Sequence, residues 1–174
     1  MKIFNASIVF SALFAILATT AAFAQTETFS DPNVEYTFDI PATKWKMTSK
    51  PSPTSPNVEY VFGDRSDGHL EIRKLSVPQD AVMSDIIRSE EQKAQFLQGY
   101  VAGKEENFGG HLNGSVFNFE FVRASRPMSG RFYFLRANPT TVYVLRFTAY
   151  RDKLRSIRNQ TDAMARSFKV KAAA

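Results

Sequence analysis

Two arginines and a tyrosine stand inside segments that otherwise have the character of apolar strands. Arg131 and Tyr133 lie in "GRFYFLRA", and Arg146 lies in "TTVYVLRFTAY". A strand that builds a core seldom carries a charge at its centre, so these side chains need partners. The planar fork of arginine can bind a carboxylate or a phosphate through two parallel hydrogen bonds. The chemistry that these residues indicate is recognition of an anion.

Strand register decides whether the two arginines meet. If Asn138-Pro139 forms a two-residue turn, Arg131 faces Arg146 across the hairpin. Aligning the phenylalanines of the preceding strand then places Glu120 beside Tyr133. Directly opposed arginines repel each other unless an anion lies between them. We therefore expect these four side chains to share one face of a sheet.

Two interpretations of this cluster remain open. In the first, Glu120 and Tyr133 satisfy Arg131 and Arg146 within a ladder on a half-exposed face. In the second, Arg131, Arg146 and Tyr133 line a pocket for a small anion or an acidic peptide. A catalytic role is not favoured, because no nucleophile or base is evident nearby. The chain is therefore expected not to be an enzyme.

Other reactive residue types are scarce. The chain has two histidines, His69 and His111, and no cysteine. A zinc site needs three or four converging ligands, so both histidines are interpreted as surface residues near strand ends and no metal site is expected. The glycine-rich "ENFGGHLNG" precedes a strand rather than a helix, and therefore lacks the context that binds phosphate. No cofactor is expected.

The elements that would position the cluster begin with short strands. Val34 to Ile40 alternates apolar and polar residues, which predicts a half-buried strand. Val58 to Phe62 alternates again, and Leu70 and Ile72 continue a third strand beyond a turn. The proline-rich segment from Thr48 to Asn57 is expected to be a surface loop.

Two amphipathic helices are predicted. The first runs from Asp80 to near Gly103 and carries an apolar stripe that includes Glu90. The second runs from Asp152 to Phe168 and is basic on its other side. Its basic side could contact anionic lipid, but a helix that packs on a sheet has a solvent-exposed polar face in any case.

The order of elements indicates an α+β fold. About four strands lie between the helices, including a hairpin predicted at Asn113-Gly114. Neighbouring strands joined by short turns pair antiparallel. We therefore predict an antiparallel β-sheet flanked by helices. A lipocalin-like barrel is the rival, but it would need more strands and no long helix in the middle of the chain.

The N-terminus has the pattern of a secretory signal peptide. Lys2 precedes an apolar run, and Ala22-Phe23-Ala24 has the small-residue pattern of a cleavage site. A membrane anchor is the alternative, but the run is shorter than the roughly 20 residues that a spanning helix needs. We expect residues 1–24 to be removed, leaving residues 25–174 as one domain in the periplasm or outside the cell, with no transmembrane anchor.

Composition restricts the class of partner. The formal charge is +5, and loss of the single Lys2 with the signal peptide lowers it to +4. This excess favours acidic partners, whereas export and the lack of a recognisable motif argue against nucleic acid. Without cysteines the domain must be held by apolar burial, for which the chain has 16 phenylalanines.

The mature chain resembles the PsbP-like superfamily of extracytoplasmic proteins, which includes PsbP and DcrB-like members. The likeness rests on the N-terminal "DPNVEYTFDIPATKWKM", on the order of elements, and on "VYVLRFTAYRDKLRSIRNQTDAMARSFKV" at the end. It covers nearly the whole mature chain. DcrB-like proteins tend to be lipoproteins, and this chain departs from them because it has no cysteine.

The resemblance implies an α/β/α sandwich, but it does not imply one activity, because members of this fold do unrelated things. No metal ligand of the superfamily can be matched to a residue of this chain. The expected function is that of an exported, non-enzymatic binding or assembly module that docks on an envelope or membrane protein complex. The alternative is a soluble carrier of a small anionic ligand that binds at the arginine-lined sheet face.

Overall fold

The computed structural model describes residues 26–41 and 44–171. The expected signal peptide, residues 1–24, lies outside the described residues. The elements in chain order are β1 (Glu27–Ser30), β2 (Tyr36–Ile40), β3 (Trp45–Ser49), β4 (Val58–Phe62), β5 (Asp64–Ser76), α1 (Met83–Ala94), β6 (Val101–Gly109), β7 (Asn113–Arg123), β8 (Arg126–Asn138), β9 (Thr141–Tyr150), α2 (Arg151–Ser156), α3 (Arg158–Ser167) and β10 (Lys169–Val170).

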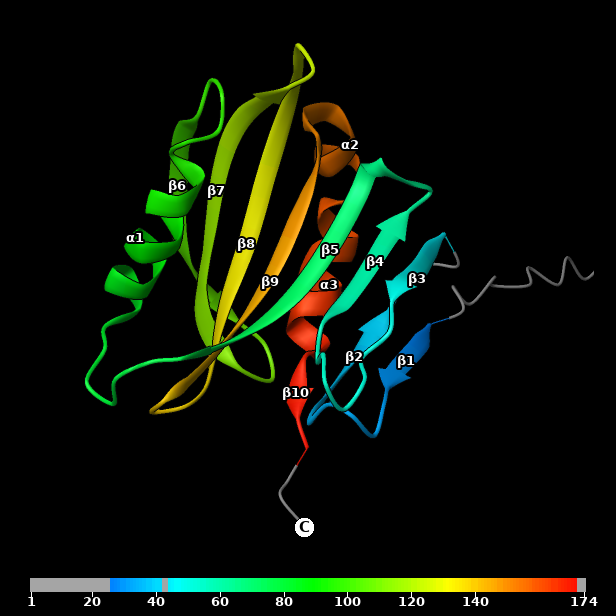
Figure 1. The fold of residues 1–174 in the computed structure, drawn as a ribbon, viewed down its shortest axis with the longest axis vertical. Helices are drawn as coiled ribbons and strands as arrows, with labels where there is room; N and C mark the ends of the chain where they lie inside the picture. The colour runs from blue at the N-terminus through cyan, green and yellow to red at the C-terminus, as the bar shows by residue number, and fades with distance from the viewer. Residues whose placement is uncertain (1–25, 42–43, 172–174) are drawn as a thin grey trace, which may run out of the picture.

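A seven-stranded antiparallel sheet forms the centre of the molecule, in the order β3-β4-β5-β9-β8-β7-β6 (Figure 1). Helix α1 lies on one face of this sheet, and α2 and α3 lie on the other (Figure 1). A second sheet of three strands, β1-β2-β10, packs on the same side as α3. The predicted α+β sandwich of a sheet flanked by helices is confirmed, and the small second sheet is an addition to it.

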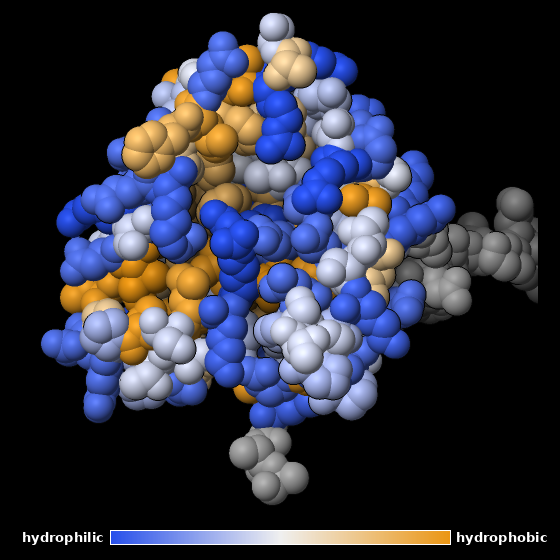
Figure 2. Space-filling view, viewed as in Figure 1, coloured by the Kyte–Doolittle hydropathy of each residue, from blue (hydrophilic) through white to orange (hydrophobic). Residues whose placement is uncertain are grey.

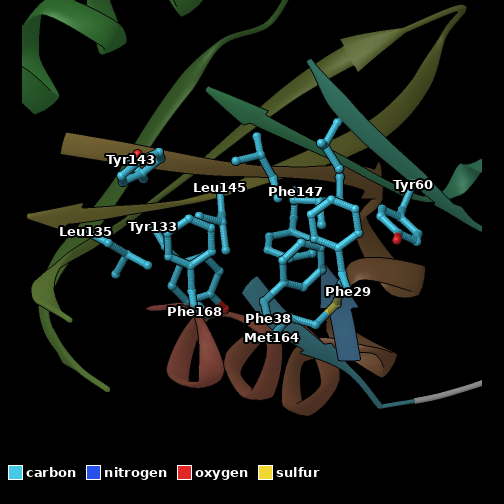
Figure 3. Packing of buried hydrophobic residues seen from close by; sticks show 14 of the residues in the cluster. Phe29, Phe38, Tyr60, Tyr133, Leu135, Tyr143, Leu145, Phe147, Met164 and Phe168 are labelled. Atoms are coloured by element: carbon cyan, nitrogen blue, oxygen red, sulfur yellow. The ribbon is translucent and has the colours of Figure 1, made fainter. Parts of the chain in front are cut away.

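The larger core fills the space between the two sheets, α2 and α3. Phe38 from the small sheet, Phe147 from the large sheet and Phe168 at the end of α3 are all buried there (Figure 3). The apolar residues predicted for β2 are buried, but Thr37 between them is buried as well, so the strand is not half-buried as predicted. The apolar stripe predicted for the C-terminal helix is buried as well, although Ile157 divides that helix into α2 and α3.

The smaller core lies under α1. Ile86 and Ile87 of the helix pack against the phenylalanines of β7 and β8 on the opposite face of the large sheet. Helix α1 ends at Ala94, earlier than the predicted end near Gly103. Gly99 adopts a positive φ of 61°, and the chain then enters edge strand β6. The apolar residues beyond Ala94 that are predicted to continue the helix therefore belong to a loop and a strand.

The registers of the hairpins differ from the predictions. In the β6–β7 hairpin Gly109 pairs with Asn113, so Gly110 to Leu112 form the connection and Asn113-Gly114 lie within β7. In the β8–β9 hairpin Asn138 pairs with Thr141, so Pro139 and Thr140 form the turn rather than the predicted Asn138-Pro139. A bulge between Arg136 and Asn138 then shifts the pairing by one residue.

The bulge changes which residues share a face. Phe132 pairs with Arg146, Arg131 pairs with Phe147 and Tyr133 pairs with Leu145. A shift of one residue moves every side chain of a strand to the other face of the sheet. The prediction that Arg131 faces Arg146 is therefore wrong, and the two arginines lie on opposite faces.

Candidate functional site

Arg146 lies on the α1 side of the large sheet, near the centre of β9. Its Nη1 donates to Glu71 Oε2 on the neighbouring strand β5 at 3.3 Å. Its Nη2 lies 3.5 Å from Glu90 Oε2 on α1. The guanidinium also lies over the Phe132 ring, 4.7 Å from the centroid, in a cation–π contact. Arg146 thus connects the sheet to the helix, but through long polar contacts.

The Arg146 guanidinium is only partly satisfied by the protein. Its Nε is buried and finds no acceptor within residues 26–41 and 44–171. Burial lowers the pKa of Arg146 from its usual range, and nearby Arg73 lowers it further, whereas Glu71 and Glu90 oppose this shift. Because buried donors normally have partners, a free buried N–H at this place suggests a role beyond packing.

A cleft of about 270 Å³ opens beside Arg146. Its apolar lining comes from Leu97 and the aromatic residues of β7 and β8; its charged lining comes from four cations and one carboxylate. The lining residues are Arg65, His69, Glu71, Lys93, Ala94, Leu97, Phe119, Phe121, Arg123, Phe132, Arg146 and Thr148. Figure 2 views this face and shows a hollow between the hydrophobic surface on the α1 side and the hydrophilic side chains along the middle.

His69 stands at one end of the cleft. It is buried rather than on the surface as expected, and its Nε2 lies 2.9 Å from Glu59 Oε2. Arg65 reaches the same carboxylate oxygen at 3.3 Å. The hydrogen bond from His69 is the main cause of a lowered pKa of Glu59. His111, by contrast, is exposed in the β6–β7 connection.

Arg131 and Tyr133 form a closed network on the other face of the sheet, against α3. Arg131 donates to Tyr133 Oη at 2.6 Å, to Asn118 Oδ1 at 2.7 Å and to Asp162 Oδ1 at 2.8 Å. The Tyr133 hydroxyl donates to Asp162 at 2.5 Å and lies 2.8 Å from Thr161. Each of the three guanidinium nitrogens of Arg131 therefore donates to an acceptor of the protein, although Arg131 also lines a cleft of about 340 Å³ on this face.

The pKa shifts of Arg131 and Tyr133 follow from the contacts within this network. Burial alone would lower the pKa of Arg131, but Tyr133 and Asp162 together raise it. Burial is also the main reason that the pKa of Tyr133 is raised. The cation and the neutral phenol are therefore the forms that the folded protein stabilises.

Glu120 belongs to neither arginine. It is half exposed on β7 and pairs with Arg151 of α2 at 3.5 Å. The predicted set of Arg131, Arg146, Tyr133 and Glu120 is thus divided in three. The bulge in the β8–β9 hairpin places Arg146 on the α1 side, and the β7–β8 register pairs Glu120 with Ser129 rather than placing it beside Tyr133 as predicted. Of these four residues, only Arg131 and Tyr133 contact each other.

The residues that accompany Arg146 come from distant parts of the chain. Glu71 and Glu90 pair with Arg146, and Lys93 pairs with Glu90. Only one feature of the sequence indicates that any of these residues belongs to a polar site. Glu90 falls on the apolar stripe of the first predicted helix, and a carboxylate on such a stripe needs a buried cation as its partner. Which cation it meets depends on how α1 packs across the sheet.

A patch of exposed apolar side chains adjoins the cleft. Phe96 is 92% exposed and directly precedes Leu97, which lines the cleft. Val101 is also exposed, but it pairs with Glu120, so its side chain lies on the α2 side of the sheet. The loop that carries Phe96 is held to the β7–β8 hairpin by a hydrogen bond from Val122 N to Gln98 O at 2.7 Å. The exposure of Phe96 is therefore a property of an attached loop.

Two kinds of site are not found in residues 26–41 and 44–171. No group of three or more histidine, aspartate or glutamate side chains is arranged to hold a metal ion there. Within the same described stretch, no helix combines the length and the apolar character that crossing a bilayer requires.

Comparison with known proteins finds similarity at the level of the fold. No family model matches the chain, and no curated protein matches it. The solution structure of the cyanobacterial PsbP protein CyanoP from Synechocystis sp. PCC 6803 is similar, with a TM-score of 0.60 and 14% identity over 87% of this chain and 95% of that one.

Two further structures are similar to this chain. LpqN of Mycobacterium tuberculosis, described as involved in cell envelope biogenesis, has a TM-score of 0.53 and 15% identity over 84% of this chain and 91% of that one. A protein of Bacteroides thetaiotaomicron has a TM-score of 0.55 and 11% identity over 83% of this chain and 48% of that one. The chain therefore has a PsbP-like fold, as its sequence resemblance implies.

Proposed function

We propose that this chain is an exported, non-enzymatic binding or assembly module that docks on a protein complex of an envelope or membrane. The PsbP-like fold supports this proposal, because the similar LpqN is described as involved in cell envelope biogenesis. The signal peptide expected at residues 1–24 supports export to the periplasm or the cell exterior. A fold by itself does not assign a function, so the proposal needs a site.

The observation that carries the proposal is the exposed patch beside α1. We call Phe96, Leu97, Lys93 and Arg123 the docking face. A phenylalanine that is 92% exposed contributes nothing to the core, whereas aromatic side chains at interfaces often supply a large share of the binding energy. The two cations at its rim predict a partner that surrounds an apolar contact with acidic side chains.

Arg123 is well suited to such a contact. It lies next to the turn of the β7–β8 hairpin and forms no ion pair with any described residue. Its guanidinium lies 5.8 Å from the Phe121 ring centroid, which keeps the side chain beside the apolar patch. Lys93, in contrast, already pairs with Glu90. We therefore expect Arg123 to make the stronger contact with an acidic partner.

Photocrosslinking in the native host tests the docking face. A photoreactive phenylalanine analogue at position 96 of the full chain should yield one discrete adduct in the envelope fraction. The same analogue at Met47 serves as the control, because Met47 is also an exposed apolar residue but lies on β3 at the other edge of the sheet. Purification and mass spectrometry of the adduct would identify the partner.

A surface substitution makes the test decisive. Phe96→Asp should abolish recovery of the identified partner and leave the melting temperature unchanged, because Phe96 packs against little of the protein. The corresponding Met47→Asp variant should retain the partner. Equal adducts from positions 96 and 47, or full recovery with Phe96→Asp, would contradict docking through this face.

Export is tested separately. We expect the mature chain to begin at Gln25 and to be recovered from the periplasm or medium of the native host. Intact mass measurement identifies the N-terminus. A chain that remains cytoplasmic with residues 1–24 attached would contradict export and would leave the docking test unaffected.

A further inference from the structure

We infer that the cleft beside α1 binds a small organic monocarboxylate with an apolar body, and that Arg146 receives its carboxylate. This inference goes beyond docking on a partner protein, because it concerns a ligand small enough to enter the cleft. It also differs from an anion site shared by Arg131 and Arg146, which lie on opposite faces of the sheet. Three observations support it.

The first observation is the contrast between the two buried arginines. Arg131 makes several short hydrogen bonds, and each of its three guanidinium nitrogens has an acceptor in the protein. Arg146 makes one hydrogen bond of 3.3 Å and a 3.5 Å ion pair, and its buried Nε finds no acceptor within the described residues. A carboxylate bound at the guanidinium could accept two parallel hydrogen bonds, which the protein does not provide there.

The second observation is the balance of charge around Arg146. Five cations line the cleft or form an ion pair with a residue that lines it: Arg65, Arg73, Lys93, Arg123 and Arg146. Three carboxylates, Glu59, Glu71 and Glu90, stand against them. The excess of positive charge favours an anion. Because Glu71 and Glu90 flank Arg146 directly, they would repel a dianion such as phosphate more strongly than a monoanion.

The third observation is the shape and lining of the cleft. Its apolar lining, formed by Leu97, Phe119, Phe121 and Phe132, can cover the apolar body of a ligand. Its volume is about 270 Å³, which equals the liquid volume of roughly nine water molecules at ~30 Å³ each. The cleft therefore suits a compact ligand, such as an arylacetate, and would exclude a polymer chain from its interior.

Titration with defined probes tests the ligand class. Phenylacetate is the probe, phenylacetamide is its neutral counterpart, and inorganic phosphate and acetate separate charge from apolar contact. Protein-observed NMR should show saturable shifts at Arg146, Thr148 and Leu97 with phenylacetate, at a Kd of about 1 mM or tighter. Phenylacetamide, acetate and phosphate should each bind at least about tenfold more weakly, a difference of about 1.4 kcal/mol in binding free energy.

Three variants assign the site. Arg146→Lys keeps the charge but loses the planar fork, so it should raise the Kd for phenylacetate about tenfold or more. Arg123→Gln changes an exposed rim residue without breaking an ion pair among described residues, and should raise the Kd about threefold, in line with the worth of an exposed charge contact. Arg158→Gln removes a similar exposed charge on the α3 side and should leave the Kd unchanged.

Each remaining outcome would overturn the inference. No saturable shift at cleft residues of the native chain would show that the cleft binds no such anion. Equal binding of phenylacetamide would show that charge is not recognised, and equal binding of phosphate would show that the ligand is not a monocarboxylate. If Arg146→Lys does not fold, Arg123→Gln and Arg158→Gln still decide, because equal Kd values for these two would place the probe elsewhere. None of these results depends on the docking partner.

Discussion

At the scale of single residues, two buried arginines show different ways to carry a charge in a sheet. Arg131 is surrounded by acceptors and is only 6% exposed. Arg146 rests on an aromatic ring between two carboxylates that hold it at longer range. Breaking a buried ion pair is costly because it leaves a charge without a partner. Arg131 is therefore expected to serve stability, whereas Arg146 retains capacity for a ligand.

Asp162→Ala should be strongly destabilising. It removes the carboxylate that accepts hydrogen bonds from both Arg131 and Tyr133, and it leaves the guanidinium buried without an anion. We expect the free energy of unfolding to fall by about 3–5 kcal/mol. Asp80→Ala, at an exposed position, should change it by no more than about 0.5 kcal/mol. Urea denaturation measures both values, and similar values for the two variants would contradict the importance of the network.

Glu35 should make stability depend on acid pH. Burial opposes its ionisation, but hydrogen bonds from Lys74 and Tyr143 outweigh burial and lower its pKa to about 2. A lowered folded-state pKa stabilises the protein above the ordinary value of 4.5, and this contribution is lost as the pH falls towards about 2. The effect will be moderate, because Glu35 is partly exposed.

Glu35→Gln tests this dependence. At neutral pH the variant should be less stable than the native chain, and the difference should shrink as the pH falls from about 5 to about 2. Glu106→Gln, on the exposed strand β6, is the matched control and should follow the native chain throughout. Urea midpoints across this range provide the measurement. A constant difference between Glu35→Gln and the native chain would show that the pKa of Glu35 is not lowered by folding.

At the scale of elements, the β7–β8 hairpin has an unusual turn. Ala124 and Ser125 connect the paired residues Arg123 and Arg126, and their φ angles are 49° and 59°. Positive φ angles at both positions are typical of a type I′ turn, which favours Asn-Gly. Alanine and serine adopt this conformation at a cost, so the tight hairpin imposes its geometry on unfavourable residues.

Replacing the turn with Asn-Gly should stabilise the protein. The double variant Ala124→Asn/Ser125→Gly places preferred residues at both positions, and we expect a gain of about 1–2 kcal/mol in the free energy of unfolding. Ser84→Gly is the contrasting control, because replacing serine by glycine at this exposed position in the first turn of α1 should cost about 0.5 kcal/mol or less. Thermal denaturation with urea titration measures both. A loss of stability in the turn variant would contradict the type I′ assignment.

At the scale of the whole molecule, the two faces of the large sheet are covered unequally. The small sheet, α2 and α3 form a continuous layer over one face, and most of the aromatic core lies beneath it. Helix α1 covers part of the other face, and the cleft lies beside it. The thickly covered face holds the fold together, so the α1 side is free to carry the docking face and the cleft.

Removing a phenylalanine ring should cost much more stability between the two sheets than on the α1 side. Phe38→Ala removes a ring that is 1% exposed between the sheets, and we expect a loss of about 3–5 kcal/mol in the free energy of unfolding. Phe96→Ala removes an exposed ring and should change stability by no more than about 0.5 kcal/mol. Calorimetry of both variants measures the contrast. A comparable loss with Phe96→Ala would indicate that Phe96 supports the fold, which would contradict its assignment to the docking face.

The order of the longer elements and their buried sides are predictable from local patterns, but the short strands β1, β3 and β10 are not predicted. Alternation predicts β2 and β4, and the stripe through Leu154, Ile157 and Met164 predicts which side of the C-terminal helices is buried. These predictions succeed because the periods of a strand and a helix are properties of a short segment. The resemblance in sequence predicts the PsbP-like fold, and the structural similarity to CyanoP confirms it.

The membership of the candidate site was decided by tertiary structure. The bulge between Arg136 and Asn138 shifts the pairing of β8 and β9 by one residue. The local sequence pattern does not reveal it, because both strands carry apolar side chains on both faces of the sheet. That single residue separates Arg146 from Arg131, whereas the pairing of β9 with β5 and the packing of α1 bring Arg146 to Glu71 and Glu90. Register and helix packing join residues that are distant in the chain, so the spacing of residues alone could indicate an arginine in need of an anion but not which anion it meets.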